Sequence, residues 1–67
     1  MPYQWSQTQE NLARVLLALF ERTAERPYLD AALEAVDGAL EEYRKAGAAF
    51  YIEKAERLRI EILARKT

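Results

Sequence analysis

The acidic and hydroxyl side chains are the groups of this chain that could do chemistry, because the sequence contains neither His nor Cys. Glu41 and Glu42 form a carboxylate pair of the kind that general acid–base catalysis uses. Adjacent residues do not face each other on a helix, so this pair cannot act on one substrate atom. The hydroxyl residues have no base at catalytic spacing: Ser6, Thr8, Thr23 and Thr67. We therefore predict that the protein is not an enzyme.

The same residue types predict no cofactor and no metal. A site for a hard cation needs Asp and Glu clustered in a loop, whereas the acids of this chain are spread along stretches with helical periodicity. A phosphate-binding loop needs closely spaced glycines followed by Lys and Ser or Thr. The sequence has only 2 glycines, which lie far apart.

Charge and hydrophobicity also limit the class of partner. The formal net charge is -1, and the basic residues near the end, which a helix-turn-helix protein could use, alternate with Glu53, Glu56 and Glu61. We therefore expect no nucleic-acid binding. No apolar run approaches the roughly 20 residues of a membrane span, and the start lacks the pattern of a secretory signal. We expect a cytoplasmic protein with no membrane contact.

Helical periodicity predicts an all-α fold for the 67 residues, taken as a single domain over 1–67. Apolar residues recur at steps of three and four over about 5–23, 27–46 and 48–65. Pro27 suits a first helical turn, and Gly47 suits the residue after a helix. The first helix begins either at Ser6, a candidate N-cap, or nearer Tyr3. Connections this short make consecutive helices antiparallel neighbours, so we predict a helical hairpin plus a third helix.

Each helix has one apolar row that predicts its core face. On the first helix the row is Trp5, Thr8, Leu12, Val15, Leu16 and Leu19. On the second it is Leu29, Ala32, Leu33, Val36, Ala39, Leu40 and Tyr43. On the third it is Ala48, Tyr51, Ala55, Leu58 and Ile62. A domain this small buries only about 60% of the surface of its unfolded chain, so regular packing and self-association are the available sources of stability.

A second apolar strip predicts an interface. Its members lie on the first and third helices: Ala13, Leu17, Phe20, Ile52, Ile60 and Leu63. These residues either widen the core or form a surface for another chain, and an exposed apolar patch marks an interaction site. We predict that this strip joins copies of the chain in a homo-oligomer.

Two segments resemble a known repeat family. Trp5-Ser6-Gln7-Thr8-Gln9-Glu10-Asn11-Leu12, followed by Val15-Leu16 and Leu19-Phe20-Glu21-Arg22-Thr23, is similar to the first helix of a long bacterial form of the tetratricopeptide repeat. Ala32, Val36 and Ala39-Leu40 are similar to its second helix. The resemblance covers about 3–45, with Ala13 and Phe20 where the family often has Gly. It implies an α-solenoid unit whose third helix caps it or begins another repeat.

The resemblance also implies a surface for a peptide. Peptide partners of the family lie along the first helices, and the matching outward positions here are Gln7, Glu10 and Arg14, with Leu17 and Ala18 beside them. The Lys and Asn set that clamps a terminal carboxylate in the family is not reproduced.

Three functions remain open at the level of sequence. The first is a protein–protein interaction module that acts mainly by self-association through exposed apolar helix faces. The second is an engineered or excised structural building block with no cellular activity, an interpretation that the tight helix ends and the absence of Cys and His favour. The third is a peptide-binding adaptor fragment, which would bind another protein or a peptide.

Overall fold

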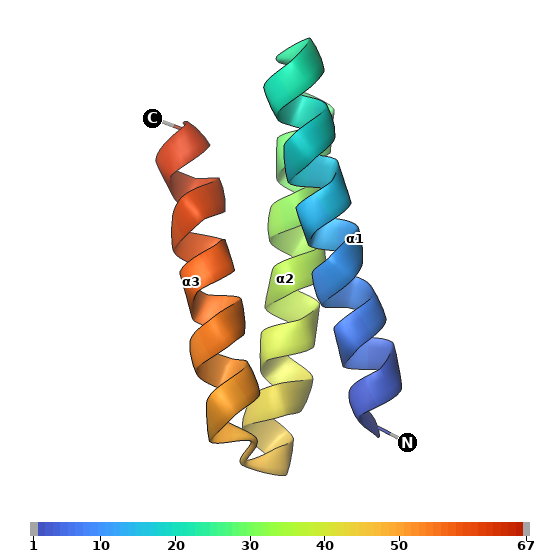
Figure 1. Cartoon of the computed structure of the whole chain (residues 1–67), viewed down its shortest axis with the longest axis vertical. Helices are drawn as coiled ribbons and strands as arrows, with labels where there is room; N and C mark the ends of the chain where they lie inside the picture. Colours follow the sequence, from blue (N-terminus) through green and yellow to red (C-terminus); the bar gives the residue numbers. More distant parts are fainter. Residues whose placement is uncertain (1, 67) are drawn as a thin grey trace.

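Three α-helices make up the chain in the computed structural model, which describes residues 2–66 (Figure 1). They are α1 (Pro2–Thr23), α2 (Arg26–Ala46) and α3 (Ala49–Lys66). The predicted all-α class, with an antiparallel hairpin and a third helix, is confirmed. The helix α1 begins three residues before the predicted start at Trp5, so Ser6 lies inside the helix and the prediction that it caps the N-terminus is wrong.

Both connections use the left-handed backbone region that ends helices. Gly47 has φ 66°, and its N–H donates to the Arg44 carbonyl at 3.2 Å. Ala24 has φ 59°, and its N–H donates to the Phe20 carbonyl at 2.6 Å. Glycine adopts this region without strain, whereas alanine does not, so the α1–α2 turn stores a small strain that the α2–α3 turn avoids.

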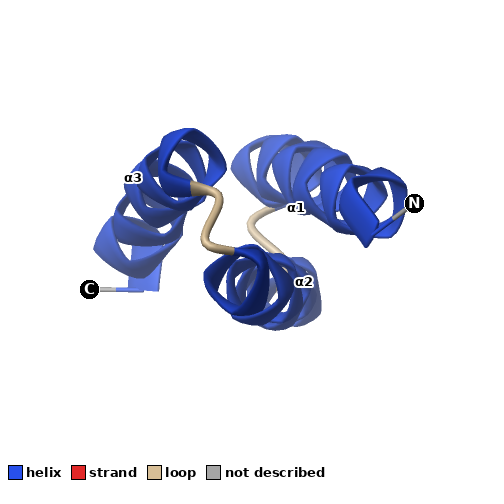
Figure 2. Ribbon diagram, turned by 90° about the horizontal axis from the view of Figure 1, so that it is seen from below, coloured by secondary structure: helices blue, strands red, loops and turns tan. Residues whose placement is uncertain are grey.

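The core lies where α2 meets the other two helices (Figure 2). The helix α1 packs most extensively on α2, α3 packs on a neighbouring face of α2, and α1 and α3 touch little. The core rows predicted for α2 and α3 are confirmed. All of the predicted α2 residues are buried except Leu33, which is half-buried, and the α3 row is buried at Ala55, Leu58 and Ile62.

The predicted core face of α1 is wrong. The buried row of this helix is Ser6, Glu10, Ala13 and Leu17. At about 100° per residue, this row lies roughly 140° around the helix from the predicted row. The reason is close packing: α2 buries three alanines, and the small residues Ser6 and Ala13 of α1 allow the two backbones to approach. Large apolar side chains at that contact would hold the helices apart.

Ion pairs tie α3 to the hairpin. Arg59 donates to Asp37 at 2.6 Å, Lys66 lies 3.1 Å from Asp30, and Arg44 donates to Glu56 at 3.0 Å; each pair joins α2 and α3. A further pair, Arg65 with Glu21 at 2.7 Å, joins α3 to α1. These pairs are solvent-exposed, where a single pair contributes at most about 1 kcal/mol. Their main effect is to fix the register of α3.

Candidate functional site

Glu10 is the centre of a polar cluster that joins all three helices. Its carboxylate is 2% exposed. The Tyr43 hydroxyl of α2 donates to Oε1 at 3.1 Å, and Arg14, one turn along α1, donates to Oε2 at 2.9 Å. Lys54 of α3 places its Nζ 3.7 Å from Oε2. A buried carboxylate is costly unless it is paired and hydrogen-bonded, and here both oxygens are engaged.

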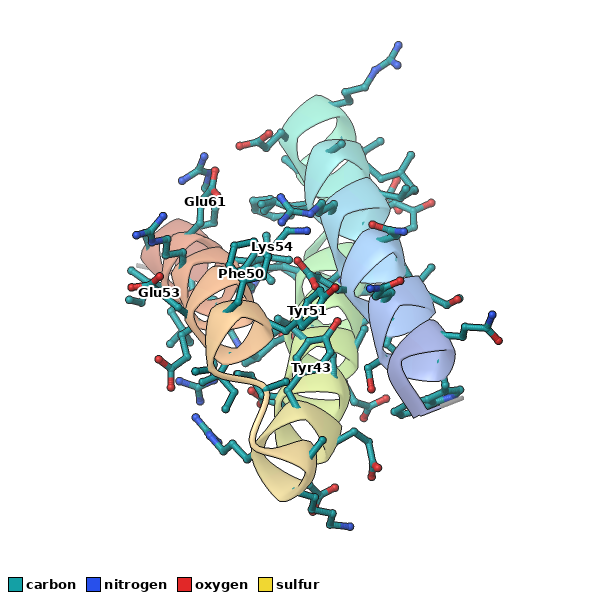
Figure 3. The ribbon with its side chains drawn as sticks, turned by 60° about the horizontal axis from the view of Figure 1, so that its bottom comes forward. Tyr43, Phe50, Tyr51, Glu53, Lys54 and Glu61 are labelled. Atoms are coloured by element: carbon teal, nitrogen blue, oxygen red, sulfur yellow. The ribbon has the colours of Figure 1, made fainter. Side chains whose placement is uncertain are left out.

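Aromatic rings cover this cluster on the α2–α3 side. Tyr43 stacks on Tyr51 with ring centroids 5.3 Å apart and planes at 24°, and Phe50 contacts Tyr51 edge-on at 5.3 Å. Figure 3 shows Tyr43, Tyr51 and Lys54 in the space between α3 and α1. Burial of the phenol, helped by its hydrogen bond to Glu10 and the charge of that carboxylate, raises the pKa of Tyr43 to about 12.

The contacts of the Glu10 cluster indicate a structural role. Glu10 accepts from α1 and α2 and lies against a cation of α3, so its carboxylate holds three helices in one arrangement. Residues 2–66 contain no group of three metal-ligating side chains and form no pocket beside it.

A row of large apolar side chains lies exposed on the outer side of α1. Its members and their exposed fractions are Trp5 52%, Leu12 43%, Val15 56% and Leu19 36%. We call these four residues, with Thr8 between them, the outer row. Glu10 and Glu21 of α1 point to α3, so the outer row lies on the side of α1 away from α3.

One end of the outer row rests on α2. A Cβ built on Gly38 would lie 3.5 Å from Cη2 of Trp5, which is ordinary van der Waals contact. The predicted packing of Trp5 on its hairpin partner is therefore present, although about half of the residue faces solvent.

The residues of the predicted interface strip differ in their exposure to solvent. Ala13 and Leu17 are buried in the chain's own core, so the prediction that they face another chain is wrong. Phe20 and Ile52 are half-buried against that core, and Leu63 is half-buried on α3. Ile60 is 67% exposed, with the charged residues Glu56 and Arg57 one turn before it on α3. The apolar face that the structure exposes is thus the one expected to be buried.

The predicted peptide-facing set is divided as well. Gln7 and Arg14 are exposed, as that prediction requires, while Glu10 is buried and unavailable to a peptide. Sequence reasoning missed Glu10 because a lone carboxylate is usually a surface residue. Two features of the sequence indicate its burial. Glu10 shares one helical face with the small or apolar residues Ser6, Ala13 and Leu17. The core tyrosine at position 43 also needs a hydrogen-bond partner.

Among residues 2–66, no helix has both the length and the apolar composition needed to cross a bilayer. Comparison with known proteins gave no matching family model, no matching curated protein and no matching solved structure.

Proposed function

We propose that the chain is a protein–protein interaction module that associates with copies of itself through the outer row of α1. The observation that supports this function is the exposure of Trp5, Leu12, Val15 and Leu19 on one helix face. Scattered apolar residues are normal on a surface, but a contiguous apolar patch marks an interaction site. The resemblance to a tetratricopeptide repeat supports the same proposal, because single repeat units leave apolar faces for a neighbour to cover.

The strength of the association follows from the exposed area. Full burial of a large apolar side chain contributes roughly 1.5–3 kcal/mol, so burial of the remaining half contributes about 1–1.5 kcal/mol. Eight such side chains in a symmetric dimer contribute about 8–12 kcal/mol, against an association cost of at least about 4 kcal/mol. At that minimum cost, the net gain of about 4–8 kcal/mol corresponds to a dissociation constant between about 1 µM and 1 mM.

Sedimentation velocity from about 10 µM to 1 mM tests the proposal across the range that this estimate requires. The wild-type chain should shift from monomer toward dimer as its concentration rises. Val15→Glu places a charge in the middle of the outer row and should leave the chain monomeric. Ile60→Glu is the matched control, because Ile60 is an equally apolar and exposed residue on α3.

The two variants distinguish an interface on the outer row of α1 from an interface on α3. Circular dichroism first confirms that both variants keep the helical content of the wild-type chain. A wild-type chain that stays fully monomeric at about 1 mM, where the weakest affinity expected would still make about half of the chains dimeric, would contradict self-association. Dissociation by Ile60→Glu but not by Val15→Glu would move the interface to α3.

A further inference from the structure

We propose that two copies pair through α1 in an antiparallel, two-fold arrangement centred on Leu12, with Trp5 of each copy against Leu19 of the other. This inference rests on the self-association proposed above and adds the orientation of the partner. In a two-fold interface the same patch serves both copies, so every contact occurs twice. The outer row satisfies this condition because its bulky ends, Trp5 and Leu19, lie seven residues on either side of Leu12.

The spacing of the outer row is that of a helix-pairing seam. Trp5, Thr8, Leu12, Val15 and Leu19 follow one another at steps of three, four, three and four. This alternation averages 3.5 residues, the repeat with which one helix packs its side chains between those of another. The row therefore fits a second helix, and α1 itself supplies that helix in a second copy.

The flanks of the seam fit an identical copy. In the heptad frame set by the outer row, the positions beside it carry no charge: Gln4, Gln9, Asn11, Leu16, Ala18 and Thr23. The charged residues of α1 up to Leu19 lie elsewhere, since Glu10 is buried against α2 and Arg14 bonds to Glu10. Flanking charges normally select a partner of opposite charge. Uncharged amides can instead both donate and accept, so like pairs with like.

Arg22 determines the direction of pairing. It continues the outer row three residues beyond Leu19 and is the charged residue of that row. A parallel pair would place the two Arg22 side chains against each other, and like charges at a contact repel. An antiparallel pair centred on Leu12 separates them by roughly 30 Å along the axis, at 1.5 Å per residue. Antiparallel helix dipoles also attract rather than repel.

The rest of the fold leaves room for this partner. The polar cluster turns the Glu10 side of α1 toward α2 and α3. The outer row meets α2 at Trp5, beside Gly38, but Trp5 and the other large side chains of the row remain 36–56% exposed. A second α1 can therefore approach along the full length of the seam without displacing a helix.

Single cysteines test the orientation, since the chain has none of its own. Leu12→Cys, Leu19→Cys and Trp5→Cys are each incubated at about 1 mM, the upper end of the expected affinity range, with oxidised glutathione as the oxidant. Covalent dimers are then counted by mass. Arg57→Cys, exposed on α3, gives the rate of random collision. Leu12→Cys should cross-link at least ten times faster than Arg57→Cys, and Leu19→Cys alone should stay near that background.

An equimolar mixture of Trp5→Cys and Leu19→Cys should give the mixed dimer in preference to either homodimer. Leu19→Cys cross-linking as fast as Leu12→Cys would show a parallel pair and overturn the inference while leaving self-association intact. Failure of Leu12→Cys to exceed background, in a chain that sedimentation shows to associate, would also overturn it. A wild-type chain that stays monomeric would instead refute self-association itself, and the outer row would then be a surface for a helix of another protein.

Discussion

Removal of the Tyr43 hydroxyl should destabilise the fold through the carboxylate that it satisfies. In Tyr43→Phe the ring and its stacking on Tyr51 remain, while the 3.1 Å hydrogen bond to Glu10 is lost. A hydrogen bond to a charged group contributes about 1.5–3 kcal/mol. Glu10 keeps its bond from Arg14 and the nearby ammonium of Lys54, so we expect a loss of about 1.5–2 kcal/mol in the free energy of unfolding at pH 7.

The pH dependence of this loss follows from the raised pKa of Tyr43. The folded state holds the proton up to about pH 12, whereas the ordinary tyrosine value is 10.0. A raised pKa favours the folded state fully below pH 10, and the advantage disappears as the pH rises from 10 toward 12. A shift of about two units corresponds to roughly 2–3 kcal/mol. The stability difference between wild type and Tyr43→Phe should therefore shrink over this alkaline window.

Guanidinium unfolding followed by circular dichroism measures both effects, at pH 7 and at steps between pH 9 and 12. Tyr28→Phe is the matched control, because it is the same chemical change at a half-buried tyrosine whose hydroxyl has no hydrogen bond within residues 4–66. Its unfolding free energy should stay within about 0.5 kcal/mol of wild type. Equal losses in the two variants, or a Tyr43→Phe difference that does not fall above pH 10, would refute the role assigned to the Tyr43–Glu10 bond.

Backbone substitutions give further predictions, each measured as a change in unfolding midpoint. Ala24→Gly should stabilise the chain by about 0.5–1 kcal/mol, because φ is 59° there and glycine avoids the strain of that region. Gly47→Ala should destabilise it by about 1 kcal/mol for the converse reason; changes of equal sign at the two sites would contradict this account. Gly38→Ala should add about 0.5–1 kcal/mol of helix propensity, since its methyl would meet Trp5 at an unstrained 3.5 Å; a loss would show that the indole lies closer than described.

The helices and two of the three core faces could be predicted from the sequence because local chemistry determines them. Pro27 and Gly47 bound α2, whose apolar residues lie mainly on one face. On α3, Ala55, Leu58 and Ile62 follow one another at steps of three and four. The face of α1 could not be predicted in this way. Apolar residues occupy more than half of its circumference, and ranking by size selected the row with Trp5 and Leu12 over the row with Ser6 and Ala13. Which face of α1 is buried depends on how closely α2 can approach it, and that distance is set by the side chains of both helices together.

The uncertain face of α1 also explains which functional residues can be predicted from the sequence. Ala13 and Leu17 were assigned to an interface only because the other row had been assigned to the core. The repeat resemblance places Glu10 on a peptide surface, and its actual partners could not correct this because Tyr43 and Lys54 lie 33 and 44 residues away along the chain. Long-range polar contacts of this kind leave no local pattern, although a buried tyrosine indicates that some acceptor must lie nearby.

The polar cluster also determines which apolar row of α1 faces solvent. If α1 rotated by roughly 140° to bury the outer row, Glu10 would leave Tyr43 and Lys54, and the buried Tyr43 hydroxyl would lose its bond to the carboxylate. Loss of a hydrogen bond to a charged group costs about 1.5–3 kcal/mol, and the large outer-row side chains would also hold the α1 and α2 backbones further apart. The bonds of Glu10 and this close packing together favour the observed arrangement, which leaves Trp5, Leu12, Val15 and Leu19 exposed. The interaction surface proposed for this chain is therefore a consequence of a charge buried on the opposite side of the same helix.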